Sequence, residues 1–163
     1  MRKVLFSCSI VLTVVLAAAT ASAQQKPAPA GPAKPTYTPG LAEFMLATQA
    51  RHTKLWLAGS AANWDLADYE IDELKEGLED AVEFVPTYKD MPVGQMIEAT
   101  ILAPIAEVEK AVKAKDRAKF VSTYDKLTEA CNSCHMAANR PFLVIQRPSA
   151  SPFPNQSFAP RPR

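Results

Sequence analysis

Proline is the residue that most constrains how this chain can fold. Most of its 14 prolines lie in two stretches, residues 24–39 and residues 141–163, where they exclude a long helix. We therefore expect a Pro- and Ala-rich leader over 24–39 and an irregular, Pro-rich extension over 141–163. Regular structure is left to residues 40–140, which are enough for one domain with its own core.

Within residues 40–140, apolar residues recur with the period of an α-helix, and no segment shows the alternation of a strand. Four helices are predicted on this pattern: Leu41–Ser60, Trp64–Val85, Pro92–Lys113 and Arg117–Asn139. Asn63 and Asp116 are suited to cap the second and fourth helices. Pro86 should stop the second helix, and Pro104 should kink or split the third.

Four amphipathic helices with short connections predict an all-α protein, and more specifically an antiparallel four-helix bundle. In such a bundle the first and third helices run one way, and the second and fourth run the other. The end of the fourth helix then lies beside the start of the first helix. It also lies beside the connection between the second and third helices.

The first 23 residues have the parts of a secretory signal peptide. A basic start is followed by the mostly apolar run Val4–Leu16 and by the small-x-small cleavage site Ala21-Ser22-Ala23. We expect cleavage before Gln24, with an uncleaved membrane anchor as the alternative. No later segment is long and apolar enough to span a bilayer. The formal net charge of +1 gives no electrostatic reason to expect a nucleic acid or an anionic membrane as partner.

The pentapeptide Cys131-Asn132-Ser133-Cys134-His135 is the motif that carries chemistry. After cleavage, its two cysteines would be the only ones left. The spacing Cys-x-x-Cys-His is an attachment signature for c-type haem. Two thiols on adjacent helical turns can reach the two vinyl groups on one edge of the porphyrin, and the following histidine can reach the iron. We therefore expect one covalent haem c on Cys131 and Cys134, with His135 as an axial ligand.

Three other interpretations of the motif compete with haem attachment. A thiol–disulfide redox pair normally opens a helix in a βαβ unit, whereas this motif lies late in a helix. A closed zinc site needs four ligands, and beyond the motif only the distant His52 is available. The cysteines could also be small core residues, although both belong to the motif. A non-haem dithiol protein remains the alternative to test.

On these residues the chain resembles the class II c-type cytochromes, the cytochrome c-prime group, over roughly Leu41 to Arg140. The resemblance implies an exported four-helix bundle with a single haem near the end of the fourth helix. It also implies thioether bonds at Cys131 and Cys134 and proximal ligation by His135. The chain departs from that group in its Pro-rich extension. It also presents His52, where the group has an apolar distal face and a five-coordinate iron.

The sixth coordination position of the iron determines the function. A strong ligand gives a low-spin electron carrier, and an open position gives a gas binder. Met45 and His52 are the main candidates, because a rise of about 1.5 Å per residue places the iron between their levels. Met91 and Met96 lie near the same end of the bundle.

We expect a periplasmic single-electron carrier, not an enzyme, that docks with redox partner proteins and could form a homodimer. The alternative is a five-coordinate haem protein that binds NO or CO.

Charged residues suggest two further features. Arg51 and Arg140 are candidates to pair with haem propionates, because an Arg fork suits carboxylates; solvated surface is the alternative. The acidic run over residues 65–83 predicts the wet face of the second helix. A docking patch for a basic partner is the alternative.

Overall fold

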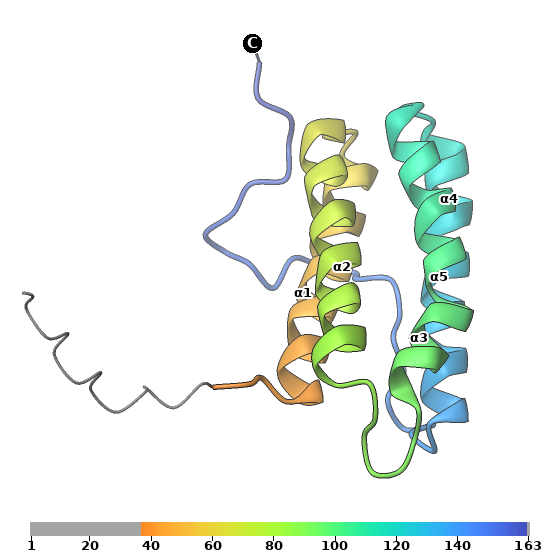
Figure 1. Cartoon of the computed structure of the whole chain (residues 1–163). Helices are drawn as coiled ribbons and strands as arrows, with labels where there is room; N and C mark the ends of the chain where they lie inside the picture. The colour runs from red at the N-terminus through yellow and green to blue at the C-terminus, as the bar shows by residue number, and fades with distance from the viewer. Residues whose placement is uncertain (1–36, 163) are drawn as a thin grey trace, which may run out of the picture. The chain divides into compact units, whose positions relative to one another are not determined.

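The computed structural model describes residues 37–162, in which the chain forms five helices and no strand (Figure 1). The helices are α1 (Leu41–Ser60), α2 (Trp64–Phe84), α3 (Val93–Thr100), α4 (Leu102–Lys113) and α5 (Arg117–Ala137). The predicted all-α class is therefore confirmed. The signal peptide predicted over residues 1–23, and the leader up to residue 36, lie outside the described residues. Within residues 37–162, no helix combines the length and the hydropathy needed to cross a membrane.

The helices begin where the sequence supplies caps. Asn63 Oδ1 accepts a hydrogen bond from the backbone N–H of Leu66 at 3.4 Å, at the start of α2. Asp116 Oδ1 accepts one from the backbone N–H of Lys119 at 2.9 Å, at the start of α5. Each side chain thus satisfies a donor that has no partner inside the helix. Both predicted caps are confirmed.

The third predicted helix is split into α3 and α4. The break falls at Ile101, and Pro104 lies in the first turn of α4. The Pro104 nitrogen has no hydrogen to donate to the carbonyl of Thr100, four residues earlier. In the first turn of a helix this loss matters little, because N–H groups there have no partner inside the helix. The predicted kink or split at Pro104 is confirmed.

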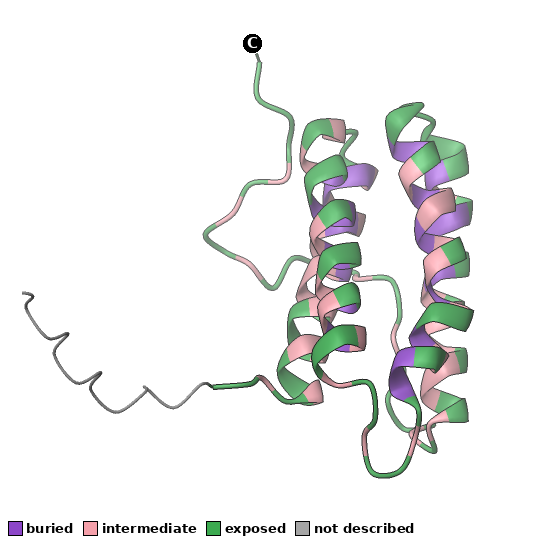
Figure 2. Cartoon of the chain, in the orientation of Figure 1, coloured by how far each residue is buried: buried purple, intermediate pink, exposed green. Residues whose placement is uncertain are grey.

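The core lies between the long helices. The helix α1 packs mainly on α2, and α4 packs mainly on α5, while α2 also contacts α4. In Figure 2 the buried residues gather on the sides of α2 and α4 that face each other. The large, fully buried apolar and aromatic side chains come from four helices: Leu55, Ile71, Leu74, Ile105, Val108, Val112, Phe120, Tyr124 and Leu127. The apolar faces predicted from the helical period are the faces that build this core.

One member of the acidic run is not on the wet face of α2. Glu70 is only 1 % exposed and accepts a hydrogen bond from Arg51 Nη1 at 3.2 Å. The other guanidinium nitrogen, Nη2, donates to Glu73 at 2.6 Å. A buried carboxylate requires such a partner. The prediction that the run is simply solvated is therefore wrong at Glu70, because its partner comes from α1.

Gly59 marks a close approach of α1 to α5, and its substitution tests how tightly the core is packed. A Cβ at this position would lie 2.2 Å from Phe120 Cζ, so the buried ring would have to move. We expect Gly59→Ala to lower the free energy of unfolding by about 1–3 kcal/mol in urea titrations. The matched control is Gly77→Ala on α2, where an added Cβ meets nothing within 4 Å. That change should raise stability by about 0.5–1 kcal/mol. A Gly59→Ala protein as stable as wild type would show that the Phe120 ring repacks freely.

Candidate functional site

A cavity of about 420 Å³ brings together the residues that the sequence analysis singled out. Its lining includes Met45, His52, Met91, Met96, Cys131, Cys134, His135 and Arg140. The remaining walls are mostly apolar and come from α1, α2, α3 and the segment after α5, including Leu41, Leu74, Leu78, Ile97, Ile101 and Leu143. The volume lies within the range of small-molecule and cofactor pockets, roughly 300–1,000 Å³. The cavity thus combines apolar walls with a small number of ligating groups.

Cys131 and Cys134 lie one turn apart near the end of α5, and neither is in a disulfide. Burial raises the pKa of the Cys131 thiol to about 11 and also raises the pKa of the Cys134 thiol. Both groups are therefore protonated thiols at neutral pH. Cysteines that carry out thiol–disulfide exchange have the opposite property, a lowered pKa. Among residues 37–162, no group of three or more His, Cys, Asp or Glu side chains is arranged to hold a metal ion.

One ring nitrogen of His135 makes a hydrogen bond to the backbone, and the other makes no hydrogen bond within residues 37–162. Its Nδ1 donates a hydrogen bond to the backbone carbonyl of Leu143 at 2.8 Å. A carbonyl oxygen can only accept, so Nδ1 carries a hydrogen, and in the neutral ring Nε2 keeps its lone pair. Metal-bound histidines are typically held in this way, with the second nitrogen donating to a carbonyl or carboxylate. In this orientation Nε2 is the ring nitrogen that is free to bind a metal.

The end of α5 explains how Leu143 reaches His135. The helix stops in a Schellman motif, with Asn139 in the left-handed region at a φ of 56°. The N–H of Arg140 donates to the carbonyl of His135 at 2.8 Å, as this motif requires. Pro141 then prevents the helix from continuing. The chain reverses, and Leu143 and Ile145 become part of the cavity wall.

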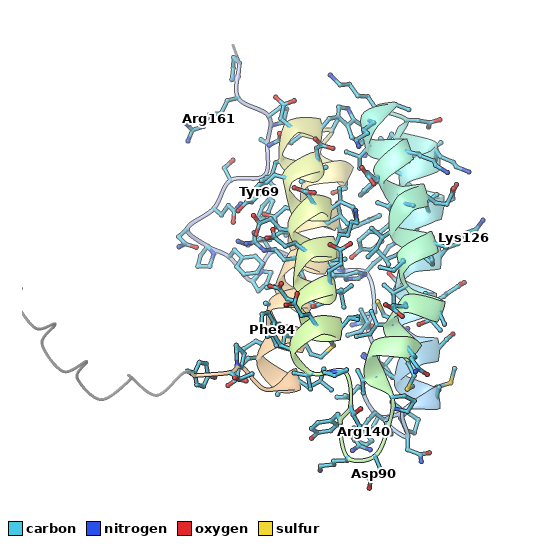
Figure 3. All side chains as sticks on the ribbon, viewed as in Figure 1. Tyr69, Phe84, Asp90, Lys126, Arg140 and Arg161 are labelled. Atoms are coloured by element: carbon cyan, nitrogen blue, oxygen red, sulfur yellow. The ribbon has the colours of Figure 1, made fainter. Side chains whose placement is uncertain are left out.

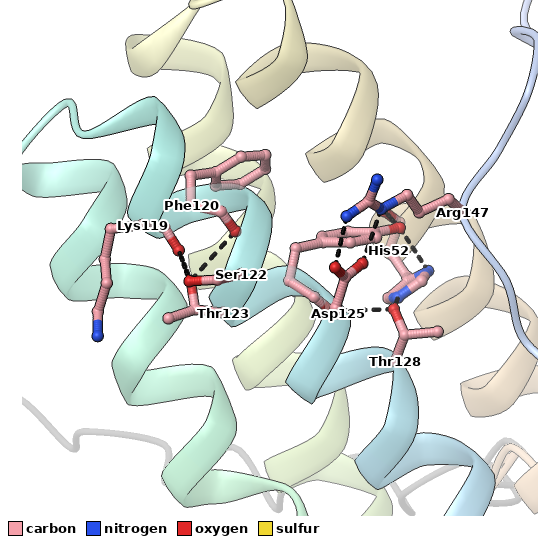
Figure 4. Close-up of polar contacts among 9 residues, drawn as sticks. His52, Lys119, Phe120, Ser122, Thr123, Asp125, Thr128 and Arg147 are labelled. Carbon is pink, nitrogen blue, oxygen red and sulfur yellow. Dashed lines mark hydrogen bonds and ion pairs between the residues drawn. The ribbon is translucent and has the colours of Figure 1, made fainter.

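His52 is only 3 % exposed, and both of its ring nitrogens are occupied (Figure 4). The Thr128 hydroxyl donates to the Tyr124 carbonyl at 2.9 Å, so it accepts from His52 Nε2–H at 2.9 Å. His52 Nδ1 is then the acceptor for the Tyr124 hydroxyl, also at 2.9 Å. Burial lowers the pKa of His52 to about 4, so the ring is neutral at pH 7. To bind iron, it would have to give up one of these hydrogen bonds.

The methionines that line the cavity have no such bonds to lose. Met45 is half-buried on α1, two turns before His52, and Met96 is half-buried on α3. Met91 lies in the connection between α2 and α3. It exchanges two backbone hydrogen bonds with Tyr88, at 2.9 and 3.0 Å, which hold this connection in a tight turn. The thioether is a weak acceptor that packs as an apolar group and can also bind metal.

Only one of the two arginines proposed for propionates lines the cavity. Arg140 is part of the wall, and Figure 3 shows it at the same end of the helices as Asp90. Arg51 is not part of the wall, because its guanidinium is paired with Glu70 and Glu73 on α2. The structure thus brings the predicted haem-attachment residues, the sixth-ligand candidates and Arg140 together, and it separates Arg51 from them.

Sequence reasoning missed the polar partners of both histidines. The Leu143 carbonyl is a backbone group, and Tyr124 and Thr128 lie on a different helix from His52. One signal was available: Asn139 followed two residues later by a proline is typical of a helix end. It could have predicted the chain reversal, but not which carbonyl would meet His135.

Comparisons with known proteins found no match to a family model, to a curated protein or to a solved structure. The function proposed below therefore depends on the residues and geometry of the cavity.

The buried, neutral His52 predicts a loss of stability in mild acid. In the unfolded chain, histidine has a pKa of about 6.5. The folded-state pKa is about 4, so the unfolded state binds the proton first. The free energy of unfolding should fall as the pH drops from about 6.5 to about 4, by about 3 kcal/mol in all.

Urea titrations across this pH range measure the effect. The His52→Gln variant is the control for carboxylate titration, and it should be less stable at pH 7 but lose less stability on acidification. Parallel pH profiles for the two proteins would contradict the assignment to His52.

Proposed function

We propose that this protein is an exported monohaem c-type cytochrome that carries single electrons between redox partner proteins in the periplasm. The observation that carries the proposal is the convergence of Cys131, Cys134 and His135 on one largely apolar cavity. Cys131 and Cys134 would hold the haem through thioether bonds, and His135 Nε2 would bind its iron. The bound haem would supply an iron that changes between the ferric and ferrous states.

The residues that are present fit this cofactor. Both thiols line the cavity, and neither is in a disulfide. The hydrogen bond from His135 Nδ1 to the Leu143 carbonyl leaves Nε2 as the ring nitrogen that can coordinate. Apolar side chains from several helices would exclude water from the faces of a porphyrin. Arg140 in the wall could pair with a propionate.

We propose that the helices around this site form an antiparallel four-helix bundle. In this bundle α3 and α4 together take the place of the third helix. Two observations support it. The helix α1 contacts α2 and α5, and α4 contacts the same two helices. In Figure 1 the chain rises along α1, descends along α2, rises along α3 and α4 and descends along α5. These directions bring the end of α5 to the level of the start of α1.

We propose Met45 as the sixth ligand in preference to His52. Ligation by His52 would break a hydrogen bond to Thr128 or Tyr124 in a buried network. Leaving a buried polar group without a partner costs about 1–3 kcal/mol. Met45 lines the same cavity and has no hydrogen bond to lose. Ligation by methionine and histidine is typical of electron-carrying cytochromes and raises the potential of the iron.

Part of the cavity lining reaches the surface, as electron exchange with a partner requires. Leu46 and Leu143 both line the cavity, and they are 69 % and 46 % exposed. A redox partner would meet these apolar side chains at the edge of the cofactor site.

Covalent haem attachment can be tested by the mass of the intact chain. After expression with the cytochrome c maturation machinery, the mature protein should gain the mass of one haem. The Cys131→Ser/Cys134→Ser double variant should gain none under the same conditions. A wild-type chain without bound haem would overturn the proposal and favour the non-haem dithiol protein.

The sixth ligand can be tested by visible spectra of the oxidised, reduced and CO-treated protein. We expect sharp, split bands on reduction and no response to CO, because Met45 would occupy the sixth position. Met45→Ala should become high-spin and bind CO promptly. The matched control is Met136→Ala, because Met136 is 59 % exposed and does not line the cavity.

Two other results would change the conclusion. If the wild-type protein is high-spin and binds CO promptly, the sixth position is open and binding of NO or CO becomes the leading function. If Met45→Ala stays low-spin and His52→Gln does not, His52 is the ligand.

A further inference from the structure

The C-terminal strap, residues 140–162, forms no helix or strand, yet named side chains hold it against the helices. Besides the His135 contact, the points of attachment are Asn132 with Ile145, Asp125 with Arg147, Lys54 with Phe153, and Asn63 with Phe158 and Ala159. The contacts begin beside the cavity and end at the connection between α1 and α2. The strap is therefore a fixed part of the fold, despite its prolines.

Asn132 makes the contact that lies nearest to His135 along α5. Its Nδ2 donates to the Ile145 carbonyl at 2.9 Å, and its Oδ1 accepts from the Ile145 N–H at 2.8 Å. A side-chain amide offers both a donor and an acceptor, so it can pair with both polar groups of one backbone residue. Aspartate lacks the donor and glutamine is longer. Asn132 is thus well matched to clamp an extended backbone against a helix.

The clamp fixes the position of Leu143 relative to His135. Asn132 and His135 are three residues apart on α5, and side chains at this spacing are neighbours on a helix surface. Ile145 and Leu143 are two residues apart on the strap. Holding Ile145 at Asn132 therefore sets where the Leu143 carbonyl lies, and this carbonyl accepts from His135 Nδ1 at 2.8 Å.

A second contact, two residues further along the chain, also holds the strap against α5. Arg147 donates to both carboxylate oxygens of Asp125, from Nε at 2.7 Å and from Nη2. Its guanidinium also lies 4.5 Å from the centre of the Trp56 ring. Figure 4 shows Arg147 on the strap above Asp125. The strap is thus held at Leu143 by His135, at Ile145 by Asn132 and at Arg147 by Asp125.

We propose that Asn132, inside the Cys-x-x-Cys-His motif, is a positioning residue that clamps the strap and thereby keeps the Leu143 carbonyl on His135 Nδ1. A hydrogen bond from Nδ1 to a carbonyl raises the basicity of the coordinating nitrogen. A more basic ligand favours ferric over ferrous iron, so the clamp lowers the reduction potential. The effect on the reduction potential depends on the proposed function. The clamp itself depends only on the hydrogen bonds between Asn132 and Ile145.

The first test measures the clamp by amide hydrogen exchange on the haem-loaded mature protein. The Ile145 amide should exchange more slowly than the Val144 amide, to which the structure assigns no acceptor within residues 37–162. In Asn132→Leu and Asn132→Ala, which both remove the donor and the acceptor of the clamp, exchange at Ile145 should be at least tenfold faster. The matched control is Ser133→Ala, because Ser133 is exposed and its one side-chain hydrogen bond within residues 37–162 is to the Glu129 carbonyl. Equal rates at Val144 and Ile145 in the wild-type protein would overturn the clamp without any variant.

The second test measures the consequence for the iron, as the midpoint potential of the same four proteins. Both Asn132 variants should have a higher potential than wild type, by several-fold in the equilibrium constant for reduction. For one electron a tenfold change corresponds to about 59 mV. Ser133→Ala should keep the wild-type potential. Fast exchange at Ile145 with an unchanged potential would overturn the tuning role.

The two proposals fail in different ways. A chain that carries no haem after maturation overturns the proposed function and, with it, the effect on the potential. The exchange rates at Ile145 can still be measured on that chain, and they test the clamp independently of haem.

Discussion

The buried hydrogen bonds between His52 on α1 and Tyr124 and Thr128 on α5 are the constraint on which the rest of the site depends. Each polar group in this network has a partner, and a shift of either helix would leave buried groups unsatisfied. The network therefore fixes the register of α1 against α5. With that register set, Met45 and Cys131 line the same cavity, because each lies beyond the network in the direction of the site.

The network also separates a tightly packed part of the core from the cavity. On one side Gly59 allows the Phe120 ring to approach α1, where the Trp56 ring stacks on it and the Tyr124 ring packs against it at a tilt. On the other side the side chains leave a volume of about 420 Å³. Close packing normally leaves few voids larger than a water molecule in a domain of this size. This cavity, bounded by the network and lined by two thiols and two imidazoles, is where we propose that a cofactor binds.

The sequence predicted well those features that depend on neighbours along the chain. The helical segments, the caps at Asn63 and Asp116 and the split near Pro104 all follow from local patterns, and all are present. The attachment motif predicted which residues of α5 would line a site. The burial of Glu70 was missed, because its partner Arg51 comes from another helix. The contacts of the strap were missed for the same reason, since Pro-rich segments have no period that shows which face packs.

The two histidines show why residue type alone could not assign the axial ligands. Both line the cavity, so position does not distinguish them. Their hydrogen bonds do: His52 uses both ring nitrogens within the core, whereas His135 uses only Nδ1. A ring with two satisfied nitrogens holds helices together, and a ring with one fixed nitrogen is oriented for coordination through the other. We therefore propose that His52 is part of the scaffold and that His135 is part of the cofactor site. The difference arises from a carbonyl that the strap brings back to the end of α5.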